Sequence, residues 1–392
     1  MQRISELPPL ALYIHFPWCV RKCPYCDFNS HELKSALPEH AYVDALLLDL
    51  EQELPAVWGR SVSSIFMGGG TPSLFSPESM DRLISGLRAR LRLTPEIEIT
   101  LEANPGTVER DRFDEYRAAG INRLSIGVQS FQDEFLNKLG RIHNARDAIR
   151  AAETAHKVGL ENFNLDLMYA LPGQSVQQAM ADVATAIDLC PSHISWYQLT
   201  IEPNTLFHHQ PPSLPDDEHT HAIEQVCRGR LATAGYIRYE ISAFAKADSR
   251  CLHNLNYWQF GDYLGIGAGA HGKLTDVSHQ TIARSWKLKN PRDYLANAAS
   301  ASRIGGSNLL SQADRVFEFM LNALRLTDGV STALFCSRTG LALDQIAEPL
   351  ARARELELLT PRSDMIRPSQ RGLDYLNDLV AMFIQPEVTD AD

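Results

Sequence analysis

Three cysteines lie close together near the start of the chain, in the run Cys19-Val-Arg-Lys-Cys23-Pro-Tyr-Cys26. They follow an apolar stretch, residues 10–16, that reads as a β-strand, so all three thiols belong to one loop. Cysteine thiolates are the usual ligands of iron–sulfur clusters, and a [4Fe-4S] cluster has four irons to ligate. Three cysteines leave the fourth iron open to a small molecule. The spacing therefore predicts a [4Fe-4S] cluster that takes part in chemistry.

A structural zinc site is the main alternative interpretation, with His15 or His31 as the fourth ligand. Zinc sites usually take paired cysteines or histidines from two places in the chain. Only one such pair, Cys23 and Cys26, occurs here, and no second pair follows. The other cysteines are scattered singly, at Cys190, Cys227, Cys251 and Cys336. A disulfide framework is disfavoured, because the count of 7 is odd and the N-terminus does not resemble a secretory signal peptide.

The composition is typical of a cytoplasmic protein with a sizeable core. The chain has 392 residues, of which 44% are hydrophobic and 22% charged. No apolar run approaches the roughly 18 residues of a membrane-spanning helix. The net charge of -11 argues against nucleic-acid binding, because such proteins concentrate Lys and Arg. We therefore expect a cytoplasmic location, no integral membrane segment and no nucleic-acid partner.

Strands and helices are predicted to alternate through the first half of the chain. The expected strands are short β-branched and aromatic runs at 11–16, 64–67, 97–102, 123–128, 163–168 and 193–201. The expected helices are 38–54, 77–91, 108–118, 145–158 and 176–189. Such alternation predicts a parallel sheet with helices outside it. Six units predict an α/β fold with an open, partial (β/α)6 barrel, whose functional loops follow the carboxyl ends of the strands.

Polar residues stand at these strand ends. Gly68-Gly69-Gly70-Thr71-Pro72 follows the second strand, Glu102 ends the third, Gln129 ends the fourth, and Asp166 lies in the fifth. Each alone could be a turn, a cap or a core polar group. Buried carboxylates are costly unless partnered, so their recurrence on successive strands predicts a binding site.

The chain is predicted to have three parts: 1–240, the partial barrel; 241–310, a connecting segment; and 311–392, a C-terminal domain. In the last part we expect helices at 313–326 and 343–354, a hairpin around 361–364 and a helix at 370–383, an order that resembles a winged-helix module. Its 8 Lys and Arg stand against 13 Asp and Glu, which favours an interaction or lid role over DNA binding. The GxGxxG run at 267–272 lacks a following helix, so we expect a turn-rich surface there.

Six motifs together resemble the HemN-related branch of the radical S-adenosylmethionine (radical SAM) family. They are the cysteine loop, GGGTPS, EANPGT, GVQSF, LGRIH and NLDLMYALPGQ, in this order. The resemblance implies that Cys19, Cys23 and Cys26 bind a [4Fe-4S] cluster whose open iron takes S-adenosylmethionine. It also implies an S-adenosylmethionine site made of Tyr13, Tyr25, Gly69, Gly70, Thr71, Glu102, Gln129, Arg141 and Asp166.

Two features distinguish between branches of this family. The oxygen-independent coproporphyrinogen III oxidases carry a further cysteine two residues after the motif, where this chain has Asp27-Phe28. The run from His253 to Trp258, HNLNYW, is similar to the HNxxYW motif of the heme-chaperone branch, which implies heme as a ligand, with His253 and Tyr257 at its site. A single histidine near aromatic residues is otherwise more often a hydrogen-bonded core residue.

The resemblance therefore favours a heme carrier over an enzyme, and no residue is assigned a catalytic role. It implies heme-accepting partners such as respiratory enzymes, and a heme donor such as a bacterioferritin. A homodimer is left open. The alternatives are a coproporphyrinogen III oxidase that decarboxylates propionate side chains, and a radical SAM enzyme for another substrate that heme regulates.

Overall fold

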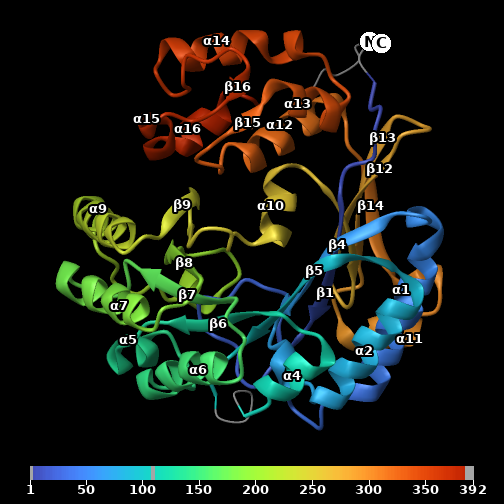
Figure 1. The fold of residues 1–392 in the computed structure, drawn as a ribbon, viewed down its shortest axis with the longest axis vertical. Helices are drawn as coiled ribbons and strands as arrows, with labels where there is room; N and C mark the ends of the chain where they lie inside the picture. The colour runs from blue at the N-terminus through green and yellow to red at the C-terminus, as the bar shows by residue number, and fades with distance from the viewer. Residues whose placement is uncertain (1–2, 107–110, 385–392) are drawn as a thin grey trace.

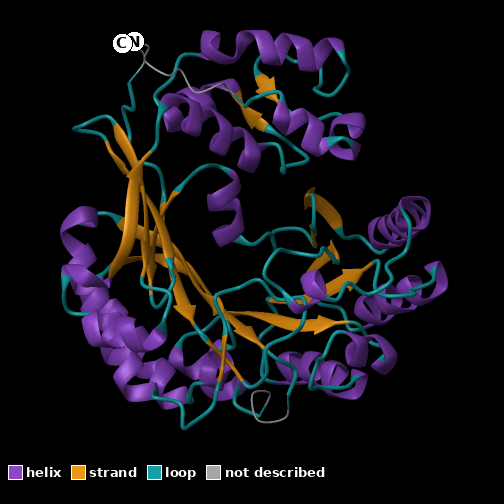
Figure 2. Ribbon diagram, turned by 180° about the vertical axis from the view of Figure 1, so that it is seen from behind, coloured by secondary structure: helices purple, strands orange, loops and turns teal. Residues whose placement is uncertain are grey.

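The computed structural model describes residues 3–106 and 111–384, and its centre is one twisted sheet. Within those residues the sheet has 12 strands in the order β14-β13-β12-β11-β1-β4-β5-β6-β7-β8-β10-β9. Figure 2 shows the sheet as a curved wall with helices along its outer side. The sheet does not close into a full barrel, and the C-terminal helices lie on its concave side (Figure 1).

Six parallel strands form the middle of the sheet. They are β1 (Leu10–Phe16), β4 (Ser61–Gly69), β5 (Arg92–Ala103), β6 (Arg123–Gln129), β7 (Phe163–Tyr169) and β8 (His193–Gln198). Most of their residues are buried, as expected for parallel strands covered on both faces. The predicted α/β fold with a partial (β/α)6 barrel is confirmed.

Helices cover the outer face of these strands. They are α1 (Glu39–Val57), α2 (Pro77–Arg90), α4 (Phe113–Ala119), α5 (Asp133–Lys138), α6 (Ala145–Lys157), α7 (Val176–Asp188) and α9 (Asp217–Thr233). Capping boxes start α6 at Asn144 and α7 at Ser175, and α4 ends at Gly120, whose φ of 108° suits glycine. The start of the helix predicted at 108–118 lies outside the described residues, and neither α5 nor α9 is predicted from the sequence.

The sheet continues beyond the six strands at both edges. On the β1 side, β11 (Asp262–Ile266) is parallel to β1, and β12 (His271–Asp276), β13 (Thr281–Lys287) and β14 (Ile304–Leu309) follow antiparallel. On the β8 side lie β10 (Ala243–Ala245) and β9 (Ile237–Glu240). Short elements complete this part: β2 (Trp18–Cys19), β3 (His31–Glu32), η1 (Pro72–Leu74), α8 (Leu206–His209), α11 (Pro291–Asn297) and η2 (Ala301–Arg303).

The GxGxxG segment, expected as a turn-rich surface, is instead largely buried between β11 and β12. Gly267 has a φ of 103°, and a side chain there would collide with the backbone carbonyl of His15. Its N–H donates to Asp49 at 3.2 Å, and Ala268 N donates to Tyr42 OH at 3.0 Å. The glycines serve close packing of the turn against α1 and β1.

A buried ionic cluster joins the added strands to α1. Asp49 is fully buried, and its carboxylate accepts from Lys287 Nζ at 2.7 Å, Arg303 Nε at 2.7 Å and Tyr294 OH at 2.8 Å. Glu53 pairs with the same Lys287 and Arg303. A buried charge is tolerated when its hydrogen bonds are all made, as they are here.

The C-terminal domain has its own core and is mainly helical. Its elements are α12 (Gln312–Ala323), β15 (Val330–Ser331), α13 (Thr332–Thr339), η3 (Leu343–Ile346), α14 (Ala347–Glu355), β16 (Met365–Ile366), α15 (Gln370–Asp374) and α16 (Leu376–Ala381). Phe319, Phe335 and Ile366 are fully buried in its core. The hairpin expected around 361–364 is present as an antiparallel bridge between Leu359 and Pro368, whereas the β15–β16 pair and α13 are not predicted from the sequence. The helix predicted at 370–383 is divided at Tyr375 into α15 and α16.

A short helix, α10 (Leu252–Trp258), lies between the barrel and α12 (Figure 1). Its N-terminus is fixed by Glu98 of β5, which accepts from the backbone N–H groups of His253 at 3.2 Å and Leu252 at 3.3 Å. The helix carrying the HNLNYW run is thus a link between the two parts of the molecule. In the described part of the chain, no helix combines the length and apolarity needed to cross a membrane.

Candidate functional site

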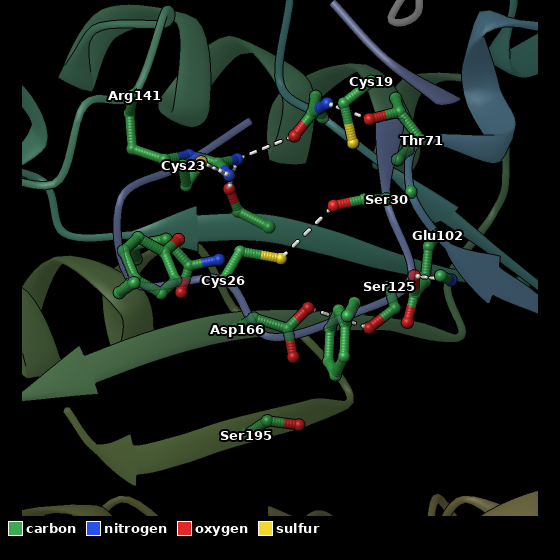
Figure 3. Close-up of a pocket in the computed structure, with 18 of the residues that line it drawn as sticks. Cys19, Cys23, Cys26, Ser30, Thr71, Glu102, Ser125, Arg141, Asp166 and Ser195 are labelled. Atoms are coloured by element: carbon green, nitrogen blue, oxygen red, sulfur yellow. Dashed lines mark hydrogen bonds between the residues drawn. The ribbon is translucent and has the colours of Figure 1, made fainter. Parts of the chain in front are cut away.

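A cavity of about 490 Å³ lies at the carboxyl ends of the parallel strands. The loop after β1 supplies Cys19, Cys23 and Cys26, and Figure 3 shows their thiols facing the cavity. The opposite wall comes from the ends of β5, β6, β7 and β8. The cavity therefore stands where the loops of an α/β barrel carry function.

The cysteine loop is held in place by backbone hydrogen bonds at its two ends. His31 N donates to Pro17 O at 2.7 Å, and Leu33 N donates to Cys19 O at 2.9 Å. Cys26 Sγ lies 3.7 Å from Ser30 Oγ. Burial raises the pKa of Cys19 to about 11 and also raises that of Cys26. A cationic centre is needed to hold such thiols as thiolates.

The donor set fits an iron–sulfur cluster. In the ranges 3–106 and 111–384, no three His, Cys, Asp or Glu side chains are arranged to ligate one metal ion. The three thiols instead border a cavity. A cubane cluster takes each cysteine on a different iron, so its ligands need not converge on one point.

Two carboxylates face the cysteines across the cavity. Glu102 Oε2 accepts from Gly69 N at 3.0 Å, and Asp166 accepts from Ser125 Oγ at 3.0 Å and Asn164 Nδ2 at 2.9 Å. Burial, and secondly the charge of Asp166, raise the pKa of Glu102 to about 8. Burial also raises the pKa of Asp166. A cation in the cavity would relieve both carboxylates, and S-adenosylmethionine carries a sulfonium and an ammonium group.

Arg141 connects the cysteine loop to the strand ends. Its Nη2 donates to Asn104 Oδ1 and Gly127 O, both at 2.7 Å, and its Nη1 donates to Cys23 Sγ at 3.6 Å. Its Nε is buried and lacks a hydrogen-bond partner among the described residues. The guanidinium can therefore still donate to an anionic group such as a ligand carboxylate.

The glycine turn after β4 permits close approach to the cysteine loop. Gly69 has a φ of 107°, and a side chain there would collide with the His15 ring. Thr71 N donates to Trp18 O at 2.7 Å, and Asn104 Nδ2 donates to Thr71 Oγ1 at 3.0 Å. A larger residue at Gly69 would push the turn away from β1, and one at Gly70 would collide with the backbone carbonyl of Trp18 in the cysteine loop.

The structure brings most of the predicted site residues together. Tyr25, Gly69, Gly70, Thr71, Glu102, Gln129, Arg141 and Asp166 line the cavity with the three cysteines. Tyr13 does not line it, and its OH lies 3.0 Å from His15 Nδ1. Further lining residues are not predicted from the sequence: Ser30, Asn104, Ser125, Ser195 and Tyr197. They are single polar residues with no motif of their own, apart from Asn104, which lies within EANPGT.

His253 and Tyr257 are separated from the cavity. His253 is 1% exposed, with Nδ1 3.0 Å from Ser64 Oγ and Nε2 2.9 Å from Tyr257 OH. Burial lowers the pKa of His253 to about 3. An axial ligand offers a free ring nitrogen to the iron, so heme could reach His253 only after Tyr257 moves. Asn254 and Trp258 of the same helix do line the cavity.

We expect Asp166→Asn to weaken S-adenosylmethionine binding at least about tenfold, because it removes one of the two carboxylates facing the cysteines. Isothermal titration on the anaerobically reconstituted protein measures this. Asp182→Asn is the matched control: Asp182 is also buried and accepts from Ser130 Oγ at 2.8 Å, but it does not line the cavity. Equal affinities in wild type and Asp166→Asn would exclude this placement of the ligand.

Comparisons with known proteins agree with this geometry. Residues 13–185 match the radical SAM superfamily, and residues 310–375 match the HemN C-terminal domain. Coproporphyrinogen III oxidase (HemN) from Escherichia coli, described as a radical SAM enzyme, has a similar fold with a TM-score of 0.82. That match covers 97% of this chain and 91% of the other, at 23% identity.

Three curated relatives carry the name heme chaperone HemW. The Escherichia coli protein is 50% identical over 97% of this chain and 99% of its own length. The Haemophilus influenzae protein is 47% identical over 98% of this chain and 100% of its own length. The Bacillus subtilis protein is 34% identical over 85% of this chain and 88% of its own length. The resemblance read from the six motifs is confirmed. Identity of this extent over nearly the whole length shows that the chain belongs to the HemW family, within the radical SAM superfamily.

Proposed function

We propose that this protein is a cytoplasmic heme chaperone, which binds heme and transfers it to heme-dependent proteins, built on a [4Fe-4S] and S-adenosylmethionine-binding scaffold. Its near full-length similarity to proteins named heme chaperone HemW supports this proposal. Heme-accepting partners such as respiratory enzymes, and a donor such as a bacterioferritin, belong to the same proposal.

In this proposal each part of the cavity has a separate task. Cys19, Cys23 and Cys26 hold the cluster, which when bound supplies an iron open to S-adenosylmethionine. Glu102 and Asp166 hold the positive groups of that ligand, while Arg141 pairs with its carboxylate through the free Nε. The glycine turn keeps the ligand close to backbone N–H groups.

The observation that carries heme binding is the apolar rim of the cavity. Val20, Phe28 and Ile142 line the cavity and are nevertheless 46%, 58% and 55% exposed. Large exposed apolar side chains around a pocket mark an interaction site, and a porphyrin ring offers a matching flat apolar face. Phe28 also stands at the position where the oxidase branch has its further cysteine.

The test measures heme binding and porphyrinogen oxidation on one anaerobic preparation. We expect heme titration, followed by Soret absorbance, to saturate near one heme per chain. Coproporphyrinogen III should persist in the presence of S-adenosylmethionine and a reductant. Consumption of coproporphyrinogen III without stable heme binding would instead identify an oxidase.

A substitution on the rim tests whether heme binds there. Phe28→Asp should weaken heme binding severalfold or more, because it places a charge against the apolar ring. Trp58→Asp is the control, since Trp58 is 82% exposed on the surface and does not line the cavity. If both variants bind heme as wild type does, heme does not sit on this rim.

A further inference from the structure

The cavity has a second end, away from the cysteines, where the C-terminal domain meets the barrel. Glu240 at the end of β9, Ser242 beside it, and Asn254 and Trp258 of α10 line this end. Arg325, just after α12, also lines it, and it is the single contribution of the described C-terminal domain to the cavity wall. This end is therefore built by segments that only the assembled fold brings together.

Arg325 is fixed in position by its backbone and by its side chain. The residues that follow it pair with β9: Leu326 forms a β-bridge with Glu240, and Thr327 N donates to Tyr239 O at 3.1 Å. The guanidinium of Arg325 lies over the Trp258 ring, 4.2 Å from its centroid, and its Nη2 donates to Glu240 Oε2 at 2.9 Å. A stacked, ion-paired guanidinium is preorganised to make further planar hydrogen bonds.

Two N–H groups at this end are buried without a hydrogen-bond partner in the described structure: Trp258 Nε1 and Arg325 Nε. A buried donor without a partner is costly, and a ligand, an ordered water or strain at a functional site accounts for such groups in native proteins. Among the cavity-lining residues the same condition recurs in Arg141, at the cysteine end. Residues with an unpaired buried donor thus line the cavity at both of its ends.

Arg325 at the second end keeps donors that Glu240 does not use. Glu240 is 3% exposed, and its other oxygen already accepts from Ser242 N at 3.1 Å. Arg238 lies on the same strand, where its Nε and Nη2 donate to the backbone carbonyl groups of residues 240 and 241, but it does not line the cavity. An arginine has five donors, and Glu240 accepts from one of those of Arg325, so the guanidinium keeps donors for a second acceptor.

We propose that Arg325, stacked on Trp258, binds a carboxylate of the ligand at the second end of the cavity, and that this carboxylate is a propionate of heme. The inference rests on the proposed function for the identity of the ligand. It assigns the C-terminal domain a direct role in ligand recognition. Arg325 supplies charge-assisted hydrogen bonds to the carboxylate, and the indole face of Trp258 supports the guanidinium.

The test compares iron protoporphyrin IX with its dimethyl ester, in which both carboxylates are blocked. Wild-type protein should bind the free acid at least about tenfold more tightly than the ester. In Arg325→Gln this preference should fall to about twofold or less, through loss of affinity for the acid alone. Arg250→Gln is the matched control, because Arg250 also stacks on a ring, that of Tyr239, and pairs with Asp328, but does not line the cavity. It should keep the wild-type preference.

Each other outcome has a distinct meaning. Equal binding of acid and ester by wild type would overturn the assignment of Arg325 while leaving heme binding intact. Equal loss of both ligands in Arg325→Gln, with a lowered melting temperature, would show a structural role and also overturn it. Loss of S-adenosylmethionine affinity in place of heme affinity would assign the pair to that ligand's carboxylate. If wild type binds neither porphyrin, the proposed function itself fails.

Discussion

Replacing Cys19, Cys23 and Cys26 together by alanine is expected to reduce the iron content after anaerobic reconstitution from about four atoms per chain to nearly none. The physical reason is that these three thiols are the cysteines that line the cavity. Of the others, Cys227, Cys251 and Cys336 are buried elsewhere, and Cys190 is exposed. Iron and sulfide analysis measures the effect, and the visible absorbance of the cluster should disappear in parallel.

Cys190→Ala provides the control for this experiment. Cys190 is an exposed thiol that does not line the cavity, so its removal should leave iron and sulfide unchanged. An unchanged iron content in the triple variant would contradict the assignment of the cluster. Loss of iron in Cys190→Ala as well would point to general instability of the reconstituted protein.

The six central strands could be predicted from the sequence because parallel strands buried on both faces leave short, nearly continuous apolar runs. The strands added at the two edges of the sheet could not be predicted in this way. In β12, Lys273 is only 2% exposed and reaches Asp262 Oδ1 at 3.1 Å, so a buried residue there carries a charge. A charged residue within a short run makes that run resemble a loop in the sequence, because its buried partner lies on another strand. The burial of segment 267–272 could not be predicted for the same reason, since its packing partners lie in β1 and α1.

The residues of the candidate site also fall into two groups, those that a local sequence pattern predicts and those whose partners are distant in the chain. The cysteine loop and the glycine turn are local patterns, so their spacing alone indicates chemistry. The partners of His253 are not local: Ser64 is 189 positions away in the chain, and Glu98, which fixes the start of α10, is 155 positions from His253. Arg325 has no motif at all. Its position in the cavity wall depends on contacts with Trp258 and Glu240, which are brought beside it only by the fold.

In protein prepared without S-adenosylmethionine, Glu102→Gln is expected to raise the melting temperature at pH 8.5 by a few degrees and to change it little at pH 5. Burial, and then the charge of Asp166, raise the folded-state pKa of Glu102 from 4.5 to about 8. Between these two values the folded state binds more protons than the unfolded state, so the free energy of unfolding falls as pH rises. The full penalty is present above about pH 8.

The size of this effect is limited by the cavity. A pKa shift of Glu102 from 4.5 to about 8 would lower the free energy of unfolding by a few kcal/mol if the carboxylate were wholly shielded from water. Glu102 is only partly buried because it faces the cavity, so water there reduces the penalty to about 2 kcal/mol. In a chain of this length that corresponds to a few degrees at most. Scanning calorimetry across the pH series measures it.

Glu39→Gln is a control of opposite sign. Burial alone would raise the pKa of Glu39, but hydrogen bonds from Ser76 and Ser79 outweigh it and lower the pKa overall. Glu39 therefore stabilises the fold above its unfolded pKa, and this contribution is lost as pH falls. Its replacement should lower the melting temperature at pH 8.5, with a difference that shrinks in acid.

Adding S-adenosylmethionine should reverse the order of stability between wild type and Glu102→Gln at pH 8.5. A cation bound between Glu102 and Asp166 turns the destabilising carboxylate into a binding partner. Stabilisation by a ligand grows with the logarithm of its concentration over Kd, so wild type, with the lower Kd, gains more than the variant. Glu102 would then be a residue that costs stability in the free protein because it is placed for a positively charged ligand. A variant no more stable than wild type at pH 8.5 without ligand, or equally stabilised by the ligand, would contradict this interpretation.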